Sequence, residues 1–499
     1  MSIRKTAFIV LKYLLLIYFK QCSTSTQKMN VLLITVDDLR PQLGAYEGQD
    51  FPASLQVKMH TPYIDALAAK SLLLKRAYVQ VALCSPSRTC LLTGRRPHTT
   101  NVFHIGPYFR EVGGNFTTIP QYFKINGYST IGIGKVFHGG SSSAGNDPIS
   151  WTEPHLDGVS HFENSGRSWS AVPDEQLKVK PLVDQQIADK TIKTLRKFAP
   201  KALSGKKPFF VAIGLNKPHL PFVFPKSFMK HYPDVELPEN PYAPVNMPSI
   251  ANYRCSRLYK DVNATRKDEH KNKALSDSYV VNLRRAYYSC VSYIDSLVGR
   301  ILSELDTLGL SNRTIVSLWG DHGFQLGEHG MWCKHSNFEL ATHTPMMIHI
   351  PGLTDKGVSS RQVTESVDMF PTLVEAAGLP SLQPCPVNSR EVALCSEGTN
   401  LMPLIKNPHG PLKTAAFSQY QRKGYMGYNM RTDRYRYTEW AKFNDAPEYR
   451  PNWSNLAGVE LYDHDIDPQE NVNRAFNKDY TSIRQELSRL LRSSYERGL

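Results

Sequence analysis

The stretch Asn30-Val31-Leu32-Leu33-Ile34-Thr35-Val36 is an almost continuous apolar run, and the carboxylates of Asp37 and Asp38 follow it directly. Short apolar runs rich in β-branched residues are typical of strands buried on both faces of a parallel sheet. Three later stretches repeat this arrangement of a strand-like run with polar residues at its end. They are 130–134 (TIGIG) before Lys135 and His138, 209–215 (FFVAIGL) before Lys217 and His219, and 314–319 (TIVSLW) before Asp321 and His322.

Helical patterns separate these strand-like runs. The clearest covers residues 279–305, where apolar residues recur at helical spacing, and shorter helices are expected after Thr61-Pro62 and over 118–126. Strands that alternate with helices predict an α/β fold with a mostly parallel sheet sandwiched by helices. Ligands of such sheets bind at the carboxyl ends of the strands, so we expect the polar strand ends to form one shared site.

The pattern changes after about residue 410. Four short strand candidates lie at 415–420, 425–432, 435–440 and 459–462, and an amphipathic helix over 482–497 follows them. No helix separates these strands, which predicts an antiparallel sheet. We therefore expect a catalytic domain over residues 26–420 and a smaller C-terminal α+β domain over 421–499.

A cysteine lies at the start of a predicted helix. The stretch Cys84-Ser85-Pro86-Ser87-Arg88 is followed, after a short helical turn, by Leu92-Thr93-Gly94. Pro86 suits the first turn of a helix, because the N–H that it lacks is one that a helix leaves unpaired. Residue 84 then sits where free N–H groups and the helix dipole favour an anion, and Arg88 lies one turn further on the same face. The sequence therefore predicts an anion pocket here.

The N-terminus resembles a secretory signal peptide. Arg4-Lys5 precede a mostly apolar run over 7–19, and small residues follow over 23–26. We expect residues 1–25 to be removed and the chain to enter the secretory pathway, with the lysosome or secretion as its destination. An uncleaved anchor is the alternative, because Lys12 and Lys20 interrupt the run. No other segment approaches the roughly 20 apolar residues of a membrane span, so no stable membrane insertion is expected after cleavage.

Other features agree with an extracytoplasmic chain. The N-x-S/T sequons are Asn115, Asn263, Asn312 and Asn452, and these are the expected glycosylation sites. Cys385 and Cys395 bracket a short proline-containing loop and are the expected disulfide, whereas the pairing of Cys90, Cys255, Cys290 and Cys333 stays open. A net charge of +14 is compatible with a polyanionic substrate such as a sulfated glycan, and equally with an ordinary basic surface. No nucleic-acid motif accompanies it, so no nucleic-acid partner is expected.

Together these motifs resemble the type I sulfatases of the alkaline-phosphatase-like superfamily, in which the cysteine is oxidised to formylglycine. Within that family the combination is most similar to the iduronate 2-sulfatases. The matching stretches are 36–41 (VDDLRP), 92–97 (LTGRRP), 115–123 (NFTTIPQYF), 134–138 (GKVFH), 217–219 (KPH), 321–323 (DHG), 326–330 (LGEHG), 336–338 (SNF) and 431–440 (RTDRYRYTEW).

The resemblance implies a metal centre. Its ligands would be Asp37, Asp38, Asp321 and His322, with Cys84, as formylglycine, completing the set. Three carboxylates make a hard, oxygen-rich site, which favours one Ca²⁺ ion over zinc.

The resemblance also implies roles for the remaining polar residues. Arg88 and Lys135 would stabilise the deprotonated nucleophile, and His138 would orient it or accept its proton. Lys334 would bind the sulfate opposite the metal, and His219 would protonate the leaving alcohol, because histidine titrates near working pH. Arg431 is a candidate for binding a substrate carboxylate, and an ordinary surface arginine is the alternative.

The implied reaction is hydrolysis of a sulfate ester in two displacements. One hydroxyl of the hydrated aldehyde attacks sulfur and the sugar alcohol leaves; the second hydroxyl then expels sulfate. The implied activity is removal of 2-O-sulfate from iduronate in heparan sulfate and dermatan sulfate. The implied partners are that sulfated glycosaminoglycan and a formylglycine-generating enzyme during maturation.

Two departures from the family pattern affect the substrate. The chain lacks a cysteine pair that iduronate 2-sulfatases carry between the Lys135 and His219 motifs, and it is shorter around 421–425. One alternative is therefore a superfamily relative acting on another sulfated sugar or on a phosphate or phosphonate ester. The other alternative is a glycan-binding protein without catalysis. Cysteine at position 84 favours sulfatase chemistry, because phosphatase relatives commonly use serine or threonine there.

Overall fold

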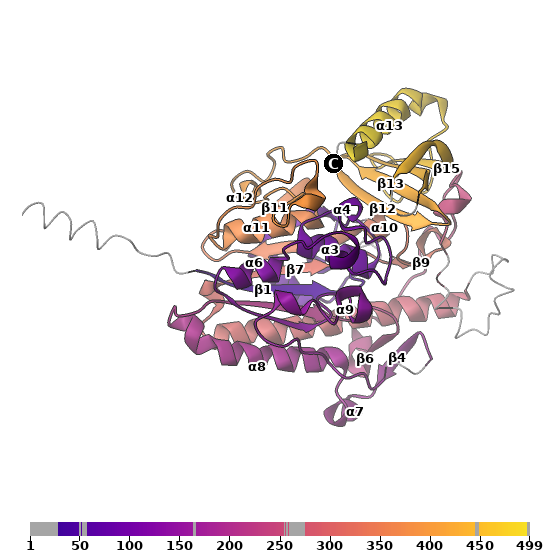
Figure 1. Ribbon diagram of the computed structural model, residues 1–499. Helices are drawn as coiled ribbons and strands as arrows, with labels where there is room; N and C mark the ends of the chain where they lie inside the picture. Colours follow the sequence, from indigo (N-terminus) through magenta and orange to yellow (C-terminus); the bar gives the residue numbers. More distant parts are fainter. Residues whose placement is uncertain are drawn as a thin grey trace, which may run out of the picture.

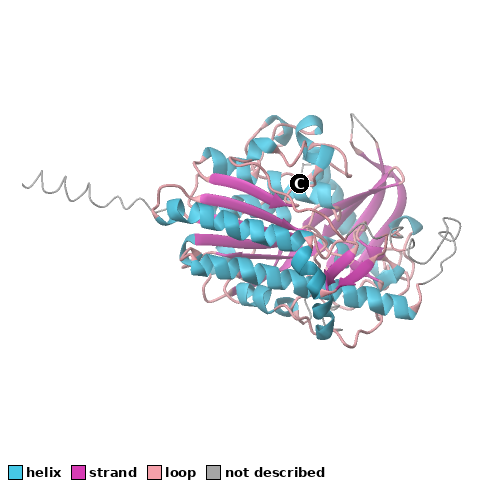
Figure 2. Ribbon diagram, turned by 90° about the horizontal axis from the view of Figure 1, so that it is seen from below, coloured by secondary structure: helices cyan, strands magenta, loops and turns pink. Residues whose placement is uncertain are grey.

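The computed structural model describes residues 28–48, 51, 57–162, 166–253, 255, 258, 275–444 and 449–496. The expected signal peptide over 1–25 and the sequon at Asn263 lie outside these residues. Two sheets organise the described chain, one of seven strands and one of four (Figure 1). Figure 2 shows them as separate groups of strands within one molecule.

The larger sheet has the strand order β11-β2-β10-β7-β1-β5-β3. Its strands are β1 (Asn30–Val36), β2 (Leu72–Tyr78), β3 (Ser129–Gly134), β5 (Phe209–Leu215), β7 (Thr314–Gly320), β10 (His343–His349) and β11 (Val358–Glu365). All neighbours are parallel except β10, which pairs antiparallel with both β2 and β7. The expected mostly parallel sheet is thus confirmed, and the four strand-like runs with polar ends are β1, β3, β5 and β7.

Helices cover both faces of this sheet. On one face α2 (Pro62–Ala68), α8 (Val183–Leu203) and α9 (Asp277–Thr307) pack on side chains such as Ile34 and Ile213. On the other face α3 (Cys84–Thr93), α6 (Ile119–Ile125) and α11 (Met369–Ala376) pack on side chains such as Leu33 and Phe210. Figure 1 shows α8 and α9 below the sheet and α3, α6 and α11 above it. Alternate residues of each strand therefore enter two separate cores.

The smaller sheet is antiparallel, in the order β12-β13-β14-β15. Its strands are β12 (Ala416–Arg422), β13 (Tyr425–Arg431), β14 (Tyr435–Phe443) and β15 (Pro451–Asp463). The closing helix α13 (Thr481–Glu496) packs Leu487 and Leu491 against one face of this sheet. The sheet begins at Ala416, a few residues before the expected domain boundary at residue 420.

The second sheet lies directly against the segment that leads into α3. The backbone N–H of Gln419 donates to the carbonyl of Gln80 at 2.8 Å, and the Ser418 hydroxyl donates to the carbonyl of Val79 at 2.6 Å. The C-terminal domain therefore helps to hold the backbone a few residues before Cys84.

The remaining elements are short. They are α4 (Pro97–Thr100), α5 (Phe109–Val112), α7 (Asp174–Val179), α10 (Glu339–Thr342), α12 (Pro403–Lys406), β4 (Trp169–Val172), β6 (Phe222–Pro225), β8 (Gln325–Leu326) and β9 (Trp332–Cys333). The expected disulfide Cys385–Cys395 is confirmed, and a second one joins Cys255 to Cys333. Among the helices of the described residues, none has the length and apolar character needed to cross a membrane.

Candidate active site

The carboxyl ends of β1, β3, β5 and β7 meet at one edge of the large sheet. The backbone N–H of Asp321 donates to the carbonyl of Val36, and that of Asp37 donates to the carbonyl of Leu215, both at 3.0 Å. The N–H of Lys135 donates to the carbonyl of Gly214 at 2.9 Å. The parallel ladder thus continues just past the strands and fixes the polar residues beside one another, as the sequence predicts.

Cys84 is the first residue of α3 and faces this edge. Its side chain is buried, and its sulfur lies 3.4 Å from Nε2 of His322. The Ser87 hydroxyl, in the same first turn, donates to the carbonyl of Asp321. The N-terminus of α3 therefore points at the strand ends, which is the expected orientation for an anion pocket.

Arg88 is fully buried and ties three strand ends together. Its Nε donates to Oδ2 of Asp321 at 2.9 Å, and one terminal nitrogen lies 3.4 Å from Oδ1 of Asp37. The other terminal nitrogen donates to the Thr35 hydroxyl at 3.2 Å and to the carbonyl of Lys135. Because these protein groups occupy its guanidinium, the structure places Arg88 as a support for the carboxylates.

Two lysines hold the adjacent aspartates. The ammonium of Lys334 lies 2.6 Å and 2.9 Å from the two carboxylate oxygens of Asp38, and that of Lys135 pairs with Asp37. Burial alone raises the pKa of both carboxyls, but the lysines and His219 outweigh it, so both pKa values are lowered. Burial, together with the charge of Asp37, raises the pKa of Asp321. The first two aspartates are thus held as carboxylates.

Two histidines complete the cluster. Nε2 of His322 lies 3.4 Å from Oδ1 of Asp38 and 3.5 Å from Oδ1 of Asp321, while its Nδ1 faces the carbonyl of Gly323 at 3.0 Å. Nδ1 of His219 contacts the carbonyl of Leu220 at 2.5 Å, which leaves Nε2 for the site. Burial, followed by the charge of Lys334, lowers the pKa of His219 to about 3.

The donor atoms of this cluster could hold a metal ion. Ligand atoms of Asp37, Cys84, Asp321 and His322 lie within 4.8 Å of one another, and the same holds for Asp37, Asp38, Cys84 and His219. Each set holds two carboxylates with one cysteine and one histidine, and together the sets bring three aspartates to one centre, which is donor chemistry that hard divalent cations prefer. The residues present therefore fit a calcium-type ion.

His138 lies at the margin of the cluster. Its Nδ1 is buried without a hydrogen-bond partner among the described residues. Burial, with the charges of Lys135 and Arg88, lowers the pKa of His138 to about 4, so the ring is neutral at mildly acidic pH. The structure thus leaves Nδ1 of His138 available as a proton acceptor at the margin of the cluster.

Arg431 is placed elsewhere, in the contact between the two domains. Its Nε donates to Oε2 of Glu339 at 3.0 Å, and its terminal nitrogens contact His464 and the carbonyl of Thr432. The side chain is 5% exposed. Within the described chain, none of its hydrogen-bond partners belongs to the strand-end cluster, so its geometry does not favour the expected role in substrate binding.

The described sequons lie at the surface. Asn115, Asn312 and Asn452 are all exposed, as glycosylation of these side chains requires.

His335 and Tyr420 lie next to the site but are not among the residues that the sequence predicts. Lys334 lies between Cys333 and His335, which both have left-handed backbone angles (φ 70° and 74°), and Cys333 is tied to Cys255. Tyr420 of β12 contacts Nδ1 of His335 at 2.8 Å. Their proximity comes from pairing between domains, and the position of His335 next to Lys334 is the only sequence signal for it.

Two family models match the chain. The sulfatase model matches residues 29–379, and the model of the C-terminal region of N-sulphoglucosamine sulphohydrolase matches residues 327–497. The first covers the large sheet and the whole strand-end cluster. The second covers the Lys334 segment and the small sheet.

Curated relatives align over most of the chain. Human iduronate 2-sulfatase is 38% identical over 522 positions, which cover 91% of this chain and 92% of that protein. The mouse iduronate 2-sulfatase is 36% identical with the same coverage, and human arylsulfatase K is 26% identical over 89% of this chain and 78% of that protein.

Solved structures share the fold at lower identity. A 2-O GAG sulfatase superposes with a TM-score of 0.69 at 21% identity, covering 94% of this chain and 92% of its own. The phosphonate monoester hydrolase of Agrobacterium radiobacter gives a TM-score of 0.69 at 20% identity, covering 95% and 96%. The chain therefore belongs to the sulfatase family: it is a type I sulfatase, a hydrolase of sulfate esters, and it is similar to iduronate 2-sulfatases over most of its length.

Proposed function

We propose that this sulfatase removes 2-O-sulfate from iduronate in heparan sulfate and dermatan sulfate, with formylglycine made from Cys84 and one bound Ca²⁺ ion. The observation that carries the proposal is the convergence of three carboxylates, two lysines and two histidines on Cys84. The similarity to iduronate 2-sulfatases supports the substrate, and it supports a lysosomal or secreted location after signal removal.

The charges of the cluster favour an anionic substrate once a metal is bound. Asp37, Asp38 and Asp321 carry three negative charges, which the cations of Arg88, Lys135 and Lys334 balance. A divalent cation would therefore leave a buried surplus of two positive charges. Such a surplus binds a sulfate ester, whose single negative charge partly neutralises it.

The thiol of Cys84 is unsuited to attack sulfur as it stands. Burial, followed by the charge of Asp37, raises the pKa of this thiol, so it stays protonated and weakly nucleophilic. Formylglycine at this position would supply a hydrated aldehyde, whose hydroxyl is the nucleophile of type I sulfatases. The calcium ion held by Asp37, Asp38, Asp321 and His322 would polarise the sulfate oxygens and lower the pKa of that hydroxyl.

The remaining side chains have separable tasks. Lys135 and Lys334 border the cluster on two sides, and their N–H groups can donate to sulfate oxygens. The free Nδ1 of His138 can take the proton of the nucleophile. His219 is our candidate for protonating the leaving alcohol, and bound sulfate would raise its low pKa by offsetting the charge of Lys334.

The test is sulfate release from a panel of substrates at pH 5 and pH 7. The panel holds a disaccharide ending in iduronate 2-sulfate, one ending in glucosamine 6-sulfate, an aryl sulfate, and a phosphonate monoester. We expect release from the iduronate substrate above all others. Mass spectrometry of the peptide containing residue 84 should show formylglycine in place of cysteine.

Two variants separate catalysis from binding and folding. Cys84→Ala should abolish sulfate release while the glycan still binds, because only the nucleophile is removed. Cys90→Ala changes another buried free cysteine of the same helix and should keep activity once it folds. Turnover of glucosamine sulfate or of the phosphonate alone would overturn the substrate assignment, and full activity of Cys84→Ala would overturn the mechanism.

A further inference from the structure

Arg422, the last residue of β12, is a partly buried arginine that forms no ion pair within the described chain, although the charge of Glu460 is near enough to raise its pKa. One terminal nitrogen donates to the carbonyls of Ile250 at 2.8 Å and Asn252 at 2.6 Å, and the other donates to the carbonyl of His335. Among the described residues, no carboxylate lies within ion-pair distance of its guanidinium. Nε of Arg422 also has no hydrogen-bond partner among the described residues, and it is partly accessible to solvent.

Most fully buried arginines of the described chain pair with carboxylates, whereas Arg95, like Arg422, donates only to backbone carbonyls. Arg96 pairs with Glu365 at 2.6 Å, and Arg436 pairs with Glu339 and Glu470 at 2.5 Å each. Removing a cation from water is costly unless a counter-charge is supplied, and burial does lower the pKa of Arg422. Arg422 is thus a partly desolvated cation with capacity for an anion.

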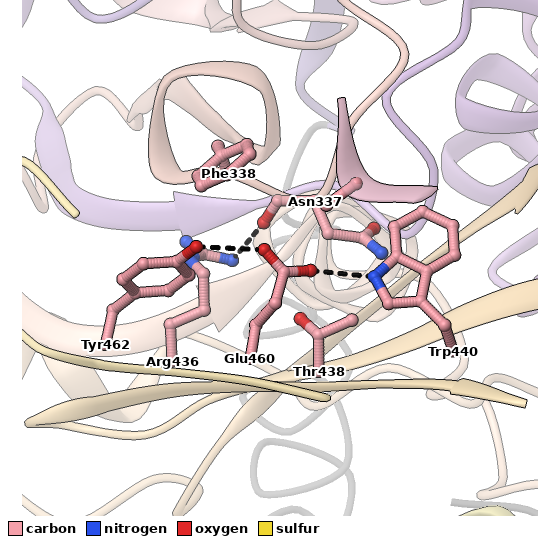
Figure 3. Close-up of a pocket in the computed structure, with 8 residues that line it drawn as sticks. Asn337, Phe338, Arg436, Thr438, Trp440, Glu460 and Tyr462 are labelled. Carbon is pink, nitrogen blue, oxygen red and sulfur yellow. Dashed lines mark hydrogen bonds between the residues drawn. The ribbon is translucent and has the colours of Figure 1, made fainter. Parts of the chain in front are cut away.

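Aromatic rings surround this guanidinium. Its central carbon lies 5.2 Å from the ring centre of Tyr253, 5.4 Å from that of Tyr420 and 5.7 Å from that of Trp440. Trp440 is itself fixed, because its indole N–H donates to Glu460 at 2.7 Å (Figure 3). The rings pack around the guanidinium without neutralising its charge, so they and the backbone carbonyls set its orientation before any ligand binds.

Arg422 is connected to the strand-end cluster through the backbone of residues 334–335. The carbonyl that it binds belongs to His335, the residue after Lys334, and the N–H of His335 donates to the carbonyl of Ala82 at 3.2 Å. The ring of His335 packs on Tyr253 with centroids 4.5 Å apart. Burial lowers the pKa of His335 and raises that of Tyr420, and the nearby charge of Lys334 lowers both. Arg422, His335 and Tyr420 therefore form a polar rim, with Arg422 as its cation, next to Lys334.

We propose that Arg422 and His335 bind the carboxylate of the sugar whose sulfate ester enters the centre, and so select uronate sulfates. The proposal rests on the function proposed above and assigns a specificity site to it. Nδ1 of His335 lies 2.8 Å from the Tyr420 hydroxyl; in the tautomer in which this hydroxyl donates, Nε2 of the ring carries the proton and can donate to a carboxylate oxygen. Nε of Arg422 supplies a second, charge-assisted donor.

The experiment compares two substrates that differ in one group. They are an umbelliferyl iduronide 2-sulfate and its carboxyl-reduced analogue, in which CH₂OH replaces the carboxylate. We measure kcat/KM for sulfate release by wild type, Arg422→Gln and Lys423→Gln at pH 5. Lys423 is the exposed neighbouring residue, so its variant removes the same charge one position away.

Wild type should prefer the carboxylate substrate by about 10- to 100-fold, the range for charge-assisted hydrogen bonds. Arg422→Gln should lose most of this preference, mainly through a higher KM for the carboxylate substrate. Lys423→Gln should keep it. An equal loss of activity on both substrates would mean that Arg422 only supports the rim, and that result would overturn the proposal.

A second variant covers the case in which Arg422→Gln does not fold. His335→Asn keeps a side chain that tolerates the left-handed backbone at this position but withdraws the ring donor. It should also reduce the preference, whereas an unchanged preference would contradict the proposed site. If wild type hydrolyses neither iduronide but releases sulfate from another sugar, the failure belongs to the proposed function and not to Arg422.

Discussion

We expect Glu460 to make the free energy of unfolding depend on pH between about 4.5 and 7. Its carboxyl is buried where the small sheet meets residues 337–338, and it accepts hydrogen bonds from Trp440 at 2.7 Å and Tyr462 at 3.0 Å (Figure 3). No cation pairs with it among the described residues. Burial raises the pKa of Glu460 from its usual 4.5 to about 7.

The sign and size of the effect follow from proton linkage. Between pH 4.5 and 7 the folded protein keeps a proton on Glu460 that the unfolded chain releases. Stabilisation from this group is fully present below pH 4.5 and is lost as pH rises through 7. A shift of this size corresponds to about 3 kcal/mol in the free energy of unfolding.

Glu460→Gln tests this reasoning, because glutamine has the shape of the protonated acid and does not titrate. Its free energy of unfolding should be within about 1 kcal/mol of wild type at pH 5. At pH 8 the variant should be more stable than wild type by about 3 kcal/mol. Urea unfolding followed by tryptophan fluorescence, repeated from pH 4.5 to 8, measures the difference. A wild-type pH slope that the substitution leaves unchanged would refute the argument.

Glu339→Gln is the matched control, since Glu339 is a buried glutamate in the same contact between domains. Its carboxylate pairs with Arg431 at 3.0 Å and Arg436 at 2.5 Å. Burial raises the pKa of Glu339, but the two arginines outweigh it and hold the pKa well below its usual value. Loss of this charge leaves buried arginines short of a partner, so we expect destabilisation of about 3–5 kcal/mol at both pH 5 and pH 8.

Three further predictions concern the centre and its surroundings. Chelation should stop sulfate release, and added Ca²⁺ should restore it. At a concentration one hundred times its dissociation constant, Ca²⁺ should also raise the free energy of unfolding by about 2.7 kcal/mol, which urea titrations with and without the ion measure. Lys334→Met leaves the Asp38 carboxylate without its cation. We expect kinetics to show a fall in kcat of at least about 100-fold, and urea unfolding of the metal-free protein to show a loss of about 3–5 kcal/mol in the free energy of unfolding. Turnover near that of wild type would argue against a role of Lys334 in binding the sulfate. Replacing Cys255 and Cys333 with serine removes a disulfide that spans a sequence separation of 78, and should lower the free energy of unfolding by about 4 kcal/mol under oxidising conditions. An equal loss in reduced wild-type protein would identify the disulfide as the cause.

The parts of the fold that the sequence predicts are those fixed by local pattern. β1 and β5 have the bounds of their apolar runs, since strands buried on both faces carry few polar residues. The sequence does not single out β2, β10 and β11, which carry charged and polar residues that find partners only in the tertiary structure. In β2, for example, Arg76 donates to the carbonyl of Thr432 at 3.0 Å, and His343 of β10 lies 3.1 Å from Glu339.

The site divides in the same way. The strand-end residues converge because parallel strands place their carboxyl ends at one edge, which a sequence pattern can indicate. The rim depends on pairing between distant segments, and Arg431 illustrates the limit. Its sequence position suggests a surface strand, but Glu339, 92 residues earlier in the chain, takes its charge inside the protein. The sequence gives no signal for Arg422, because only the three-dimensional structure shows that it forms no ion pair.

The mixed order of the large sheet has a consequence for synthesis on the ribosome. β2 pairs with β10 and β11, so the sheet beside Cys84 cannot close until Glu365 has been made, about 280 residues after the cysteine. At 5–20 residues per second, this delay is roughly 15 to 55 seconds. Under the proposed conversion of Cys84 to formylglycine, a modifying enzyme would have access to the extended segment during that time, whereas residue 84 is 2% exposed in the folded protein. Chain elongation would then act as the clock that decides which molecules mature with an active nucleophile.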